Sequence, residues 1–501
     1  MAEPYYITTA ISYPNGRPHI GHAYEAIAAD AIARYHRLAG RDVLFQTGTD
    51  EHGLKMVQTA REQGREVRAL ADEMSGYFQA MCDALNISYD RFIRTTDPDH
   101  HRASQAIWQA MADAGDLYLD RYEGWYSVRD EAFYDEKELV EEGEQKLSPQ
   151  GTPVEWTAEE TWFFRLSKYQ QPLLDLYTAN PDFIRPESRR NEVMRFVEGG
   201  LSDLSVSRTS FDWGVPVPGS PGHVMYVWVD ALTNYLTGTG YPDAMTAHWP
   251  VDVHLIGKDI VRFHAVYWPA FLLSAGIALP KSVFGHGFLL HRGEKMSKSL
   301  GNVVDPIALS EAFGVDALRY FLLREVSFGQ DGSYSAEAIV TRVNADLANG
   351  LGNLAQRCLS IIAKACGGVV PAPASAVAEP EYGDLAGKVR DFMAELRLNE
   401  ALEAIWEAVR HLNGYFADHA PWALRKTDPA AADAVLYHTA EHVRRIAILV
   451  RWVIPASADT LLDQLAQSAT ARDFAALGKV LVPGTVLPPP SGVFPRLELP
   501  A

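Results

Sequence analysis

Two short motifs carry side chains suited to phosphate chemistry. The sequence H-I-G-H at residues 19–22 lies where an early strand should turn into a helix, and K-M-S-K-S at residues 295–299 lies on a later loop preceded by a glycine. Imidazole and ammonium groups can stabilise the phosphates of a nucleoside triphosphate as charge builds on the leaving pyrophosphate. Taken singly, the histidines could simply cap a helix and the lysines could lie on a solvated loop. Finding both motifs in one chain favours nucleotide activation.

Acidic side chains follow two predicted strands. Asp50 ends one strand within T-G-T-D-E-H-G, and Asp259 ends a later one within G-K-D-I. In a parallel sheet these ends face the ligand crevice, so Asp50 could pair with an α-ammonium group and Asp259 with ribose hydroxyls. Asp50 could equally be a helix N-cap. Glu25, one turn after His22, either reaches the nucleotide or lies on a solvated helix face.

The elements around the first motif form a strand–helix–strand pattern. Residues 5–11 are rich in β-formers, an alanine-rich helix is expected over 23–38, and 42–46 reads as the next strand. This spacing predicts a parallel sheet with a right-handed crossover, and sheet character returns at 224–228 and 253–257. No G-x-G-x-x-G follows the first strand, so a dinucleotide site is not expected.

Length and composition limit the other possibilities. A chain of 501 residues is too long for one core, and 47% hydrophobic with 22% charged residues is typical of a globular protein. With no membrane-spanning stretch and no signal peptide in the sequence, we expect a cytoplasmic protein. Cys82, Cys358 and Cys366 encode neither a disulfide framework nor a thiolate zinc site. At a net charge of −19, RNA could bind only at a few basic or aromatic points.

Several longer stretches resemble the methionyl-tRNA synthetases, which are class I aminoacyl-tRNA synthetases. They are T-T-A-I-S-Y-P-N-G-R-P-H-I-G-H, T-G-T-D-E-H-G, Y-V-W-V-D-A-L-T-N-Y, G-K-D-I-V-R-F-H and G-E-K-M-S-K-S, and the resemblance spans essentially the whole chain. It implies an α/β fold: a class I synthetase Rossmann catalytic domain with an inserted connective domain, followed by an α-helical anticodon-binding bundle. The expected bounds are 1–115 and 223–290 for the Rossmann halves, 116–222 for the insert, 291–335 for the K-M-S-K-S loop and stem-contact region, and 336–501 for the bundle.

The resemblance also implies the reaction. Methionine would be activated by ATP with Mg²⁺ and transferred to the 3′ end of methionine and initiator tRNAs. The implied catalytic residues are His19, His22, Lys295 and Lys298. The implied ATP-binding residues are Gly21, Glu25, Gly257, Asp259, Leu289 and Lys298.

A methionine pocket follows from the same alignment of motifs. Aromatic faces suit a soft, polarisable thioether, and Tyr13 and His264 could donate to its sulfur. Ordinary core packing is the alternative for each apolar member taken alone. Many family members carry proline where this chain has Leu232. The implied pocket residues are Ala10, Ile11, Tyr13, Asp50, Trp228, Ala231, Leu232, Tyr235, Ile260 and His264.

The helical region contains a candidate face for base recognition. Asn349, Asn353 and Arg357 recur every four residues and so share one face of a helix, and Trp422 could stack on an unpaired base. These four positions match those with which the family reads the CAU anticodon. Buried amides and a core tryptophan are the alternative.

The sequence departs from many relatives in two respects. Ser127 and Asp130 stand where those relatives carry zinc-binding cysteines, so we expect no structural zinc. The dimerisation domain that many relatives carry after the bundle is absent, and the acidic surface disfavours self-association, so we expect a monomer.

Three other functions remain open from the sequence. The nearest is a synthetase for another amino acid. The leucine, isoleucine and valine enzymes carry a large editing insert, and the one here, of about a hundred residues, is too short. The cysteine enzyme would need zinc-ligating thiolates. A small-metabolite nucleotidylyltransferase shares the H-x-G-H chemistry but has no use for the anticodon-like helix. A non-catalytic RNA-binding relative would be expected to have lost His22 or Lys298, and both are present.

Overall fold

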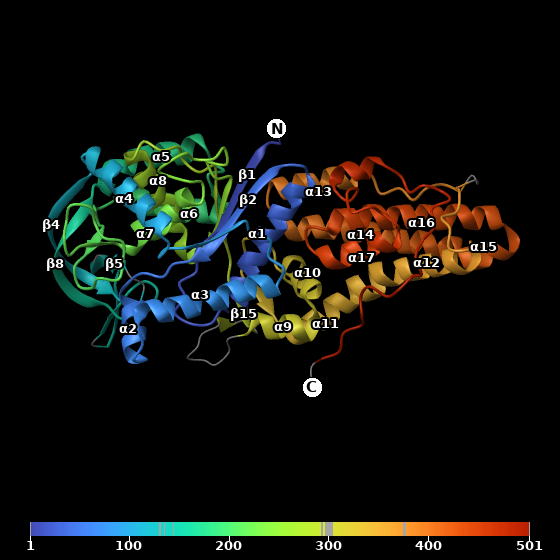
Figure 1. Ribbon diagram of the computed structural model, residues 1–501, viewed down its shortest axis with the longest axis horizontal. Helices are drawn as coiled ribbons and strands as arrows, with labels where there is room; N and C mark the ends of the chain where they lie inside the picture. The colour runs from blue at the N-terminus through green and yellow to red at the C-terminus, as the bar shows by residue number, and fades with distance from the viewer. Residues whose placement is uncertain are drawn as a thin grey trace.

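The computed structural model describes residues 2–129, 132–134, 136–143, 145–291, 294–295, 304–373 and 377–499. Figure 1 shows an elongated molecule with an α/β part at one end and a bundle of long helices at the other. Among the described residues, no helix is both long and apolar enough to cross a membrane.

A six-stranded sheet lies at the centre of the α/β part. Its strands are parallel and run in the order β3-β2-β1-β13-β14-β9. The chain moves outward from β1 to β3, re-enters the sheet at its far edge as β9 and then lies on the other side of β1 as β13. The strand order therefore reverses at β1, which makes a topological switch point, the place where ligands usually bind in such sheets. The bounds are β1 Pro4–Thr9, β2 Asp42–Thr49, β3 Arg91–Arg94, β9 Ile184–Arg185, β13 Val253–Gly257 and β14 Val283–His286.

Helices cover the sheet because their apolar faces are buried against it. The first, α1 (Ile20–Leu38), begins three residues earlier than the sequence predicts and buries a run of small side chains against β1 and β2. Gly40, at φ +83°, ends its last turn, as glycine readily does. The other helices of this part are α2 Leu54–Glu62, α3 Val67–Ala84, α4 Pro98–Asp113, α7 Val227–Thr237 and α8 Trp268–Ser274.

One predicted strand of the central sheet is wrong. Val224–Met225 form β12, which pairs antiparallel with β11 (Ser207–Arg208) outside the central sheet, and helix α7 begins at Val227. A short apolar run reads equally well as a buried strand or a buried helix, and α7 is buried on nearly every side.

The segment predicted as an insert forms a separate antiparallel sheet. Its long strands β4 (Leu117–Ser127) and β8 (Glu155–Phe164) pair along most of their length and curve around one end of the molecule (Figure 1). Strand β9 and the helices beside it return to the central sheet before the predicted end of the insert. The remaining elements are β5 Ala132–Tyr134, β6 Val140–Glu142, β7 Gln145–Leu147, β10 Leu204–Ser205, α5 Gln170–Ala179 and α6 Glu187–Glu198.

A connecting region joins the α/β part to the bundle. It contains β15 Leu289–His291, β16 Glu294–Lys295, β17 Gly332–Tyr334, α9 Pro306–Phe313 and α10 Val315–Glu325. The bundle begins with α11 (Ala336–Val343), a π-helical turn (Asn344–Gly352) and α12 (Asn353–Ala365), which follow one another without a break. Its other helices are α13 Leu385–Ala394, α14 Leu398–His419, α15 Pro421–Thr427, α16 Pro429–Val450 and α17 Pro455–Gln464.

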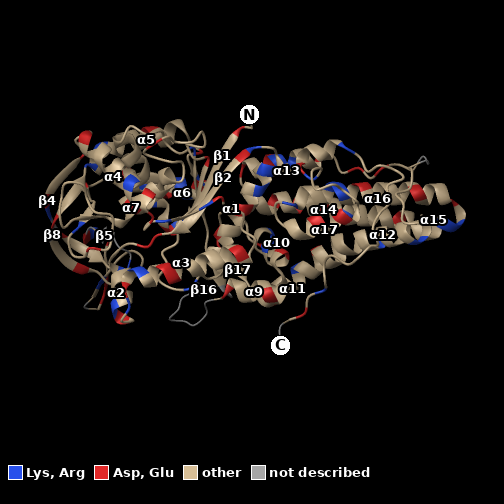
Figure 2. Cartoon of the chain, viewed as in Figure 1, with Lys and Arg blue, Asp and Glu red and all other residues tan. Residues whose placement is uncertain are grey.

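The charges are distributed over both parts. Figure 2 shows acidic and basic residues interspersed along the molecule, with basic residues at the far tip of the bundle on α15. These are Arg425 and Lys426. Arg425 forms an ion pair with Asp433 there, so both signs of charge are present at this tip.

Candidate functional site

A cavity of about 430 Å³ opens at the carboxyl ends of the central strands. It is lined by the loop after β1, the start of α1 and the segments that follow β2, β13 and β14. Many of the residues predicted from the sequence meet there, although they come from distant parts of the chain. They are Ala10, Ile11, Tyr13, His19, Gly21, His22, Glu25, Asp50, Trp228, Gly257, Asp259, Ile260 and Leu289.

The two histidines of the first motif cap α1 reciprocally. His19 Nδ1 accepts the backbone N–H of Gly21 at 3.0 Å, and His22 Nδ1 accepts the backbone N–H of His19 at 3.1 Å. A ring nitrogen that accepts carries no hydrogen, so the hydrogen of each ring is on Nε2. The capping role considered from the sequence is therefore real, and it sets both rings as donors at the entrance of the helix. A Cβ at Gly21 would come within 2.8 Å of the His19 ring, so this pairing requires glycine.

Glu25 has a fixed partner that the sequence reading missed. Its carboxylate lies 2.8 Å from Nε2 of His286, at the end of β14, and Nδ1 of that ring bonds to the carbonyl of Gly287 at 2.8 Å. Burial alone would lower the pKa of His286, but the hydrogen bond and charge of Glu25 raise it overall. Glu25 is therefore not a solvated surface carboxylate.

Backbone bonds hold the loop after β1 against the end of β2. The N–H of Ser12 donates to the carbonyl of Gly48 at 2.9 Å, and the N–H of Asp50 donates to the carbonyl of Ser12 at 2.9 Å. Asp50 is buried, and its segment lines the cavity beside Tyr13. It lies before Gly53, the residue that caps α2, so it is not the N-cap of that helix.

A buried carboxylate on α7 holds the segment after β2 and helix α4 against α7. Asp230 accepts from His52 at 2.5 Å and from His100 at 2.6 Å, and all three side chains are buried. Burial alone would raise the pKa of Asp230, but the two histidines hold it well below its usual range. Because Trp228 lies on the first turn of α7, this contact positions one wall of the cavity.

The predicted methionine pocket divides into a lining and a backing. Ala231, Leu232, Tyr235 and His264 are at most 3% exposed and do not line the cavity. Trp228, which does line it, stacks on Phe263 with ring centroids 3.8 Å apart and nearly parallel planes. The four buried residues thus support the wall from behind in this arrangement.

His264 does not carry a free donor for a thioether. Its Nδ1 bonds to the carbonyl of Ile260 at 3.1 Å and its Nε2 lies 2.7 Å from the hydroxyl of Tyr235. A carbonyl can only accept, so Nδ1 carries the hydrogen and Nε2 accepts from Tyr235. Burial lowers the pKa of His264 to about 4, so the ring is neutral at neutral pH. Of the two donors that the sequence suggested for the sulfur, only Tyr13 lines the cavity.

The second motif lies largely outside the described residues. The backbone of Lys295 is part of β16 and pairs with Leu290 of β15, next to Leu289 in the cavity wall. Lys298 and the rest of residues 296–299 are not described.

Hydroxyl groups lie near one place where relatives carry zinc-binding cysteines. Ser127 lies 2.7 Å from Thr152, which lies 2.8 Å from Ser148, and all three are buried. Within the described ranges, no three His, Cys, Asp or Glu side chains gather as a metal site, and Asp130 is outside them. From the insert, Arg129 lines the cavity at the strand ends.

The predicted base-reading residues lie on the bundle. Asn349 and Asn353 are exposed and Arg357 is half-buried. Asn349 belongs to the π-helical turn and not to α12. The three residues therefore do not share one regular α-helical face, contrary to the expectation from the sequence. The Arg357 guanidinium lies 5.0 Å from the Trp422 ring, which is 45% exposed and therefore not a core residue. Arg357 and Trp422 are thus in contact, and we refer to these two residues together with Asn349 and Asn353 as the bundle face.

Sequence reasoning missed several residues of the cavity. Asn15, Lys55, Arg129, His286 and Phe288 line it as well. His286 is the last residue of a strand of the parallel sheet, so the argument used for Asp50 and Asp259 could have found it. Arg129 comes from the insert, and only the fold could place it here.

Comparisons with known proteins identify the family of this chain. The model of the family described as tRNA synthetases class I (M) matches residues 5–359, and that of the anticodon binding domain of methionyl tRNA ligase matches residues 384–499. Methionine–tRNA ligase of Mycobacterium bovis is 60% identical over 99% of both chains. That of Mesorhizobium japonicum is 61% identical over 99% of this chain and 98% of the relative.

Solved structures show the same fold over the full length. Mycobacterium tuberculosis methionyl-tRNA synthetase in complex with methionyl-adenylate has a TM-score of 0.95 and 59% identity, covering 99% of this chain and 100% of that one. The apo form of that enzyme has a TM-score of 0.90 and 56% identity, covering 100% and 99%. The expected fold, a Rossmann catalytic part with a connective insertion and a helical anticodon-binding part, is confirmed. The chain belongs to the methionyl-tRNA synthetases of class I.

Proposed function

We propose that this chain activates methionine with ATP and transfers it to the 3′-terminal adenosine of methionine and initiator tRNAs. The observation that carries the proposal is the cavity at the strand ends, which combines donors for phosphate, a buried carboxylate and an aromatic wall. In the first step a methionine carboxylate oxygen attacks the α-phosphate of Mg²⁺-bound ATP, and the bond to pyrophosphate breaks. In the second step a hydroxyl of the terminal adenosine attacks the acyl carbon, and AMP leaves. Positioning and charge stabilisation suffice for both steps.

The phosphate end of the cavity is formed by α1. We assign the Nε2–H groups of His19 and His22 to the phosphates, because the reciprocal cap turns both Nδ1 atoms toward the backbone. The helix N-terminus adds the partial positive charge of its N–H groups. Lys295 and Lys298 would join them from the second motif as pyrophosphate develops charge.

The nucleoside and the amino acid would bind on either side of the reacting phosphate. Asp259, Gly257, Glu25 and Leu289 line the cavity and are assigned to the adenosine. Asp50 is assigned to the α-ammonium group, since a charge-assisted hydrogen bond there orients the carboxylate for attack. The thioether would lie among Ala10, Tyr13, Trp228 and Ile260.

We assign the bundle face to the CAU anticodon. Exposed amides at Asn349 and Asn353 can bond to the Watson–Crick edges of unstacked bases. Trp422 is backed by Arg357 and exposes nearly half its surface, which suits base stacking.

Four further properties are part of the proposal. We infer a protein without structural zinc, which the hydroxyl cluster around Thr152 favours. We infer a monomer in the cytoplasm, where tRNA charging takes place, and the acidic surface supports the monomer. The domain bounds remain as predicted, with the qualification that β9 returns to the central sheet.

Pyrophosphate–ATP exchange with each of the twenty amino acids tests the proposal. Methionine should support exchange strongly, and tRNA(Met) should then accept it. Strong exchange with another aliphatic amino acid would indicate a different class I synthetase. Exchange with none of them, combined with tRNA binding, would indicate a non-catalytic relative.

A further inference from the structure

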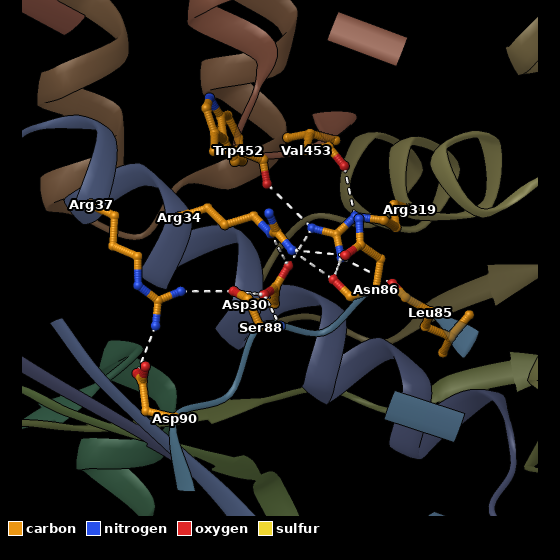
Figure 3. Close-up of polar contacts among 10 residues, drawn as sticks. All are labelled: Asp30, Arg34, Arg37, Leu85, Asn86, Ser88, Asp90, Arg319, Trp452 and Val453. Atoms are coloured by element: carbon orange, nitrogen blue, oxygen red, sulfur yellow. Dashed lines mark hydrogen bonds and ion pairs between the residues drawn. The ribbon is translucent and has the colours of Figure 1, made fainter. Parts of the chain in front are cut away.

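Arg319, on α10, is buried where three distant segments meet. Its side chain is completely inaccessible, and all three of its nitrogens have partners (Figure 3). One nitrogen donates to Asp30 of α1 at 2.6 Å and another to the carbonyl of Val453 at 2.8 Å. Weaker contacts reach the carbonyls of Trp452 and Leu85 at 3.4 and 3.3 Å. One side chain therefore joins the first helix of the Rossmann part to the α16–α17 junction of the bundle.

The acidic partner of Arg319 is held in its charged form. Asp30 also accepts from Arg34 at 2.7 Å and from the N–H and hydroxyl of Ser88 at 2.7 and 2.5 Å. Burial alone would raise the pKa of Asp30, but Arg319, Arg34 and Ser88 bring it below its ordinary value. Two buried, mutually neutralising charges with fixed hydrogen bonds tolerate little displacement, because a small shift leaves one of them unpaired.

Both ends of this contact lead to a functional region. Asp30 lies on the helix that His19 and His22 begin, about 12 Å along its axis from His22. Next to Arg319, the hydroxyl of Tyr320 donates to Asp346 at 2.7 Å. Asp346 lies in the same π-helical turn as Asn349 of the bundle face. A single turn of α10 thus contacts both the catalytic helix and the segment assigned to anticodon reading.

We propose that Arg319 is a positioning residue that couples the bundle face to the catalytic helix, so that a tRNA bound at its anticodon has its 3′ end aligned for acyl transfer. This inference rests on the proposed function. Methionine activation needs no such alignment, because all of its groups lie within the α/β part and the connecting region. Loss of the coupling should therefore affect transfer to tRNA and spare adenylate formation.

The substitution Arg319→Lys tests the coupling. Lysine keeps a positive charge for Asp30 but cannot bond in several fixed directions, so the link to Trp452 and Val453 is lost. We expect methionine-dependent exchange within about threefold of the parental rate and a fall of about tenfold in kcat for charging, with KM for tRNA nearly unchanged. The preference for tRNA(Met) over the same tRNA with one altered anticodon base should also narrow by about tenfold.

Arg324→Lys is the matched control. Arg324 lies on the same helix and pairs with Glu403 of α14, but that pair is partly exposed. This variant should charge both tRNAs like the parent. The coupling is refuted if exchange and charging fall together in Arg319→Lys, if anticodon preference is unchanged, or if the variant does not fold, because Arg319 would then serve stability alone. A parental protein that charges no tRNA with methionine would instead refute the proposed function.

Discussion

The active-site cavity and the bundle face are built in opposite ways. In the cavity, a second bond fixes three of the assigned side chains: the Nδ1 atoms of His19 and His22 accept from the backbone, and the carboxylate of Glu25 bonds to His286. On the bundle face, Asn349, Asn353 and Trp422 are exposed, and the Arg357 guanidinium lies over the Trp422 ring. Adenylate formation requires donors that are already aligned before charge develops on the phosphates. Side chains that recognise a base can instead become ordered when the base binds.

The largest effect on activity is expected from a substitution in the cavity. His22→Ala removes an Nε2–H donor directed at phosphate, so adenylate formation should fall by roughly 10²- to 10³-fold while methionine binding changes little. Pyrophosphate exchange kinetics measure adenylate formation, and equilibrium binding measures the affinity for methionine. His36→Ala is the control on the same helix, because His36 stacks on Tyr5 outside the cavity and should affect stability only. Near-parental exchange in His22→Ala would contradict the role given to the reciprocal cap.

A smaller effect on activity is expected from a substitution on the bundle face. Trp422→Ala removes one stacking platform, which is worth about 1–3 kcal/mol, so charging efficiency should fall by roughly ten- to a hundredfold. Exchange should stay at the parental rate because the ring lies on the bundle. Trp156→Ala, which removes an even more exposed tryptophan from the insert, should change neither reaction. Equal losses of exchange and charging in Trp422→Ala would contradict the assignment of Trp422 to tRNA binding alone.

The same contrast explains what could be predicted from the sequence. Strand ends of a parallel sheet converge, so Asp50, Asp259 and the H-I-G-H motif could be placed together without a structure. The wall around Trp228 was harder, because an apolar run does not distinguish a strand from the buried helix α7. The roles of His264 and His286 depend on which atoms their ring nitrogens face, and that is decided by packing between distant segments. The π-helical turn that contains Asn349 could not be predicted from the spacing of the residues.

The contact between Glu25 and His286 should make the free energy of unfolding depend on pH. Because the pKa of His286 is raised in the folded protein, its contact with Glu25 stabilises the fold fully below the unfolded value of about 6.5 and is lost as pH rises through the folded value. His286→Gln should therefore lower the free energy of unfolding at pH 6, and the difference should shrink toward pH 9. Denaturant melts across that range measure it. The exposed His411→Gln should follow the parental profile, and a difference between parent and His286→Gln that grows with pH would contradict the assignment.

The smallest effect should come from metal removal. If hydroxyl groups of Ser127, Thr152 and Ser148 replace a zinc site, the insert holds its shape through hydrogen bonds and buried contacts that a chelator cannot reach. Elemental analysis should then find well under one zinc per chain, and EDTA should leave the melting temperature unchanged. Because Arg129 reaches the cavity from this insert, the test also concerns the catalytic end. Magnesium restored after chelation should return full exchange activity, since ATP carries that ion into the site. Stoichiometric zinc whose removal unfolds the insert would show that other ligands, beyond the described residues, do the work of the missing cysteines.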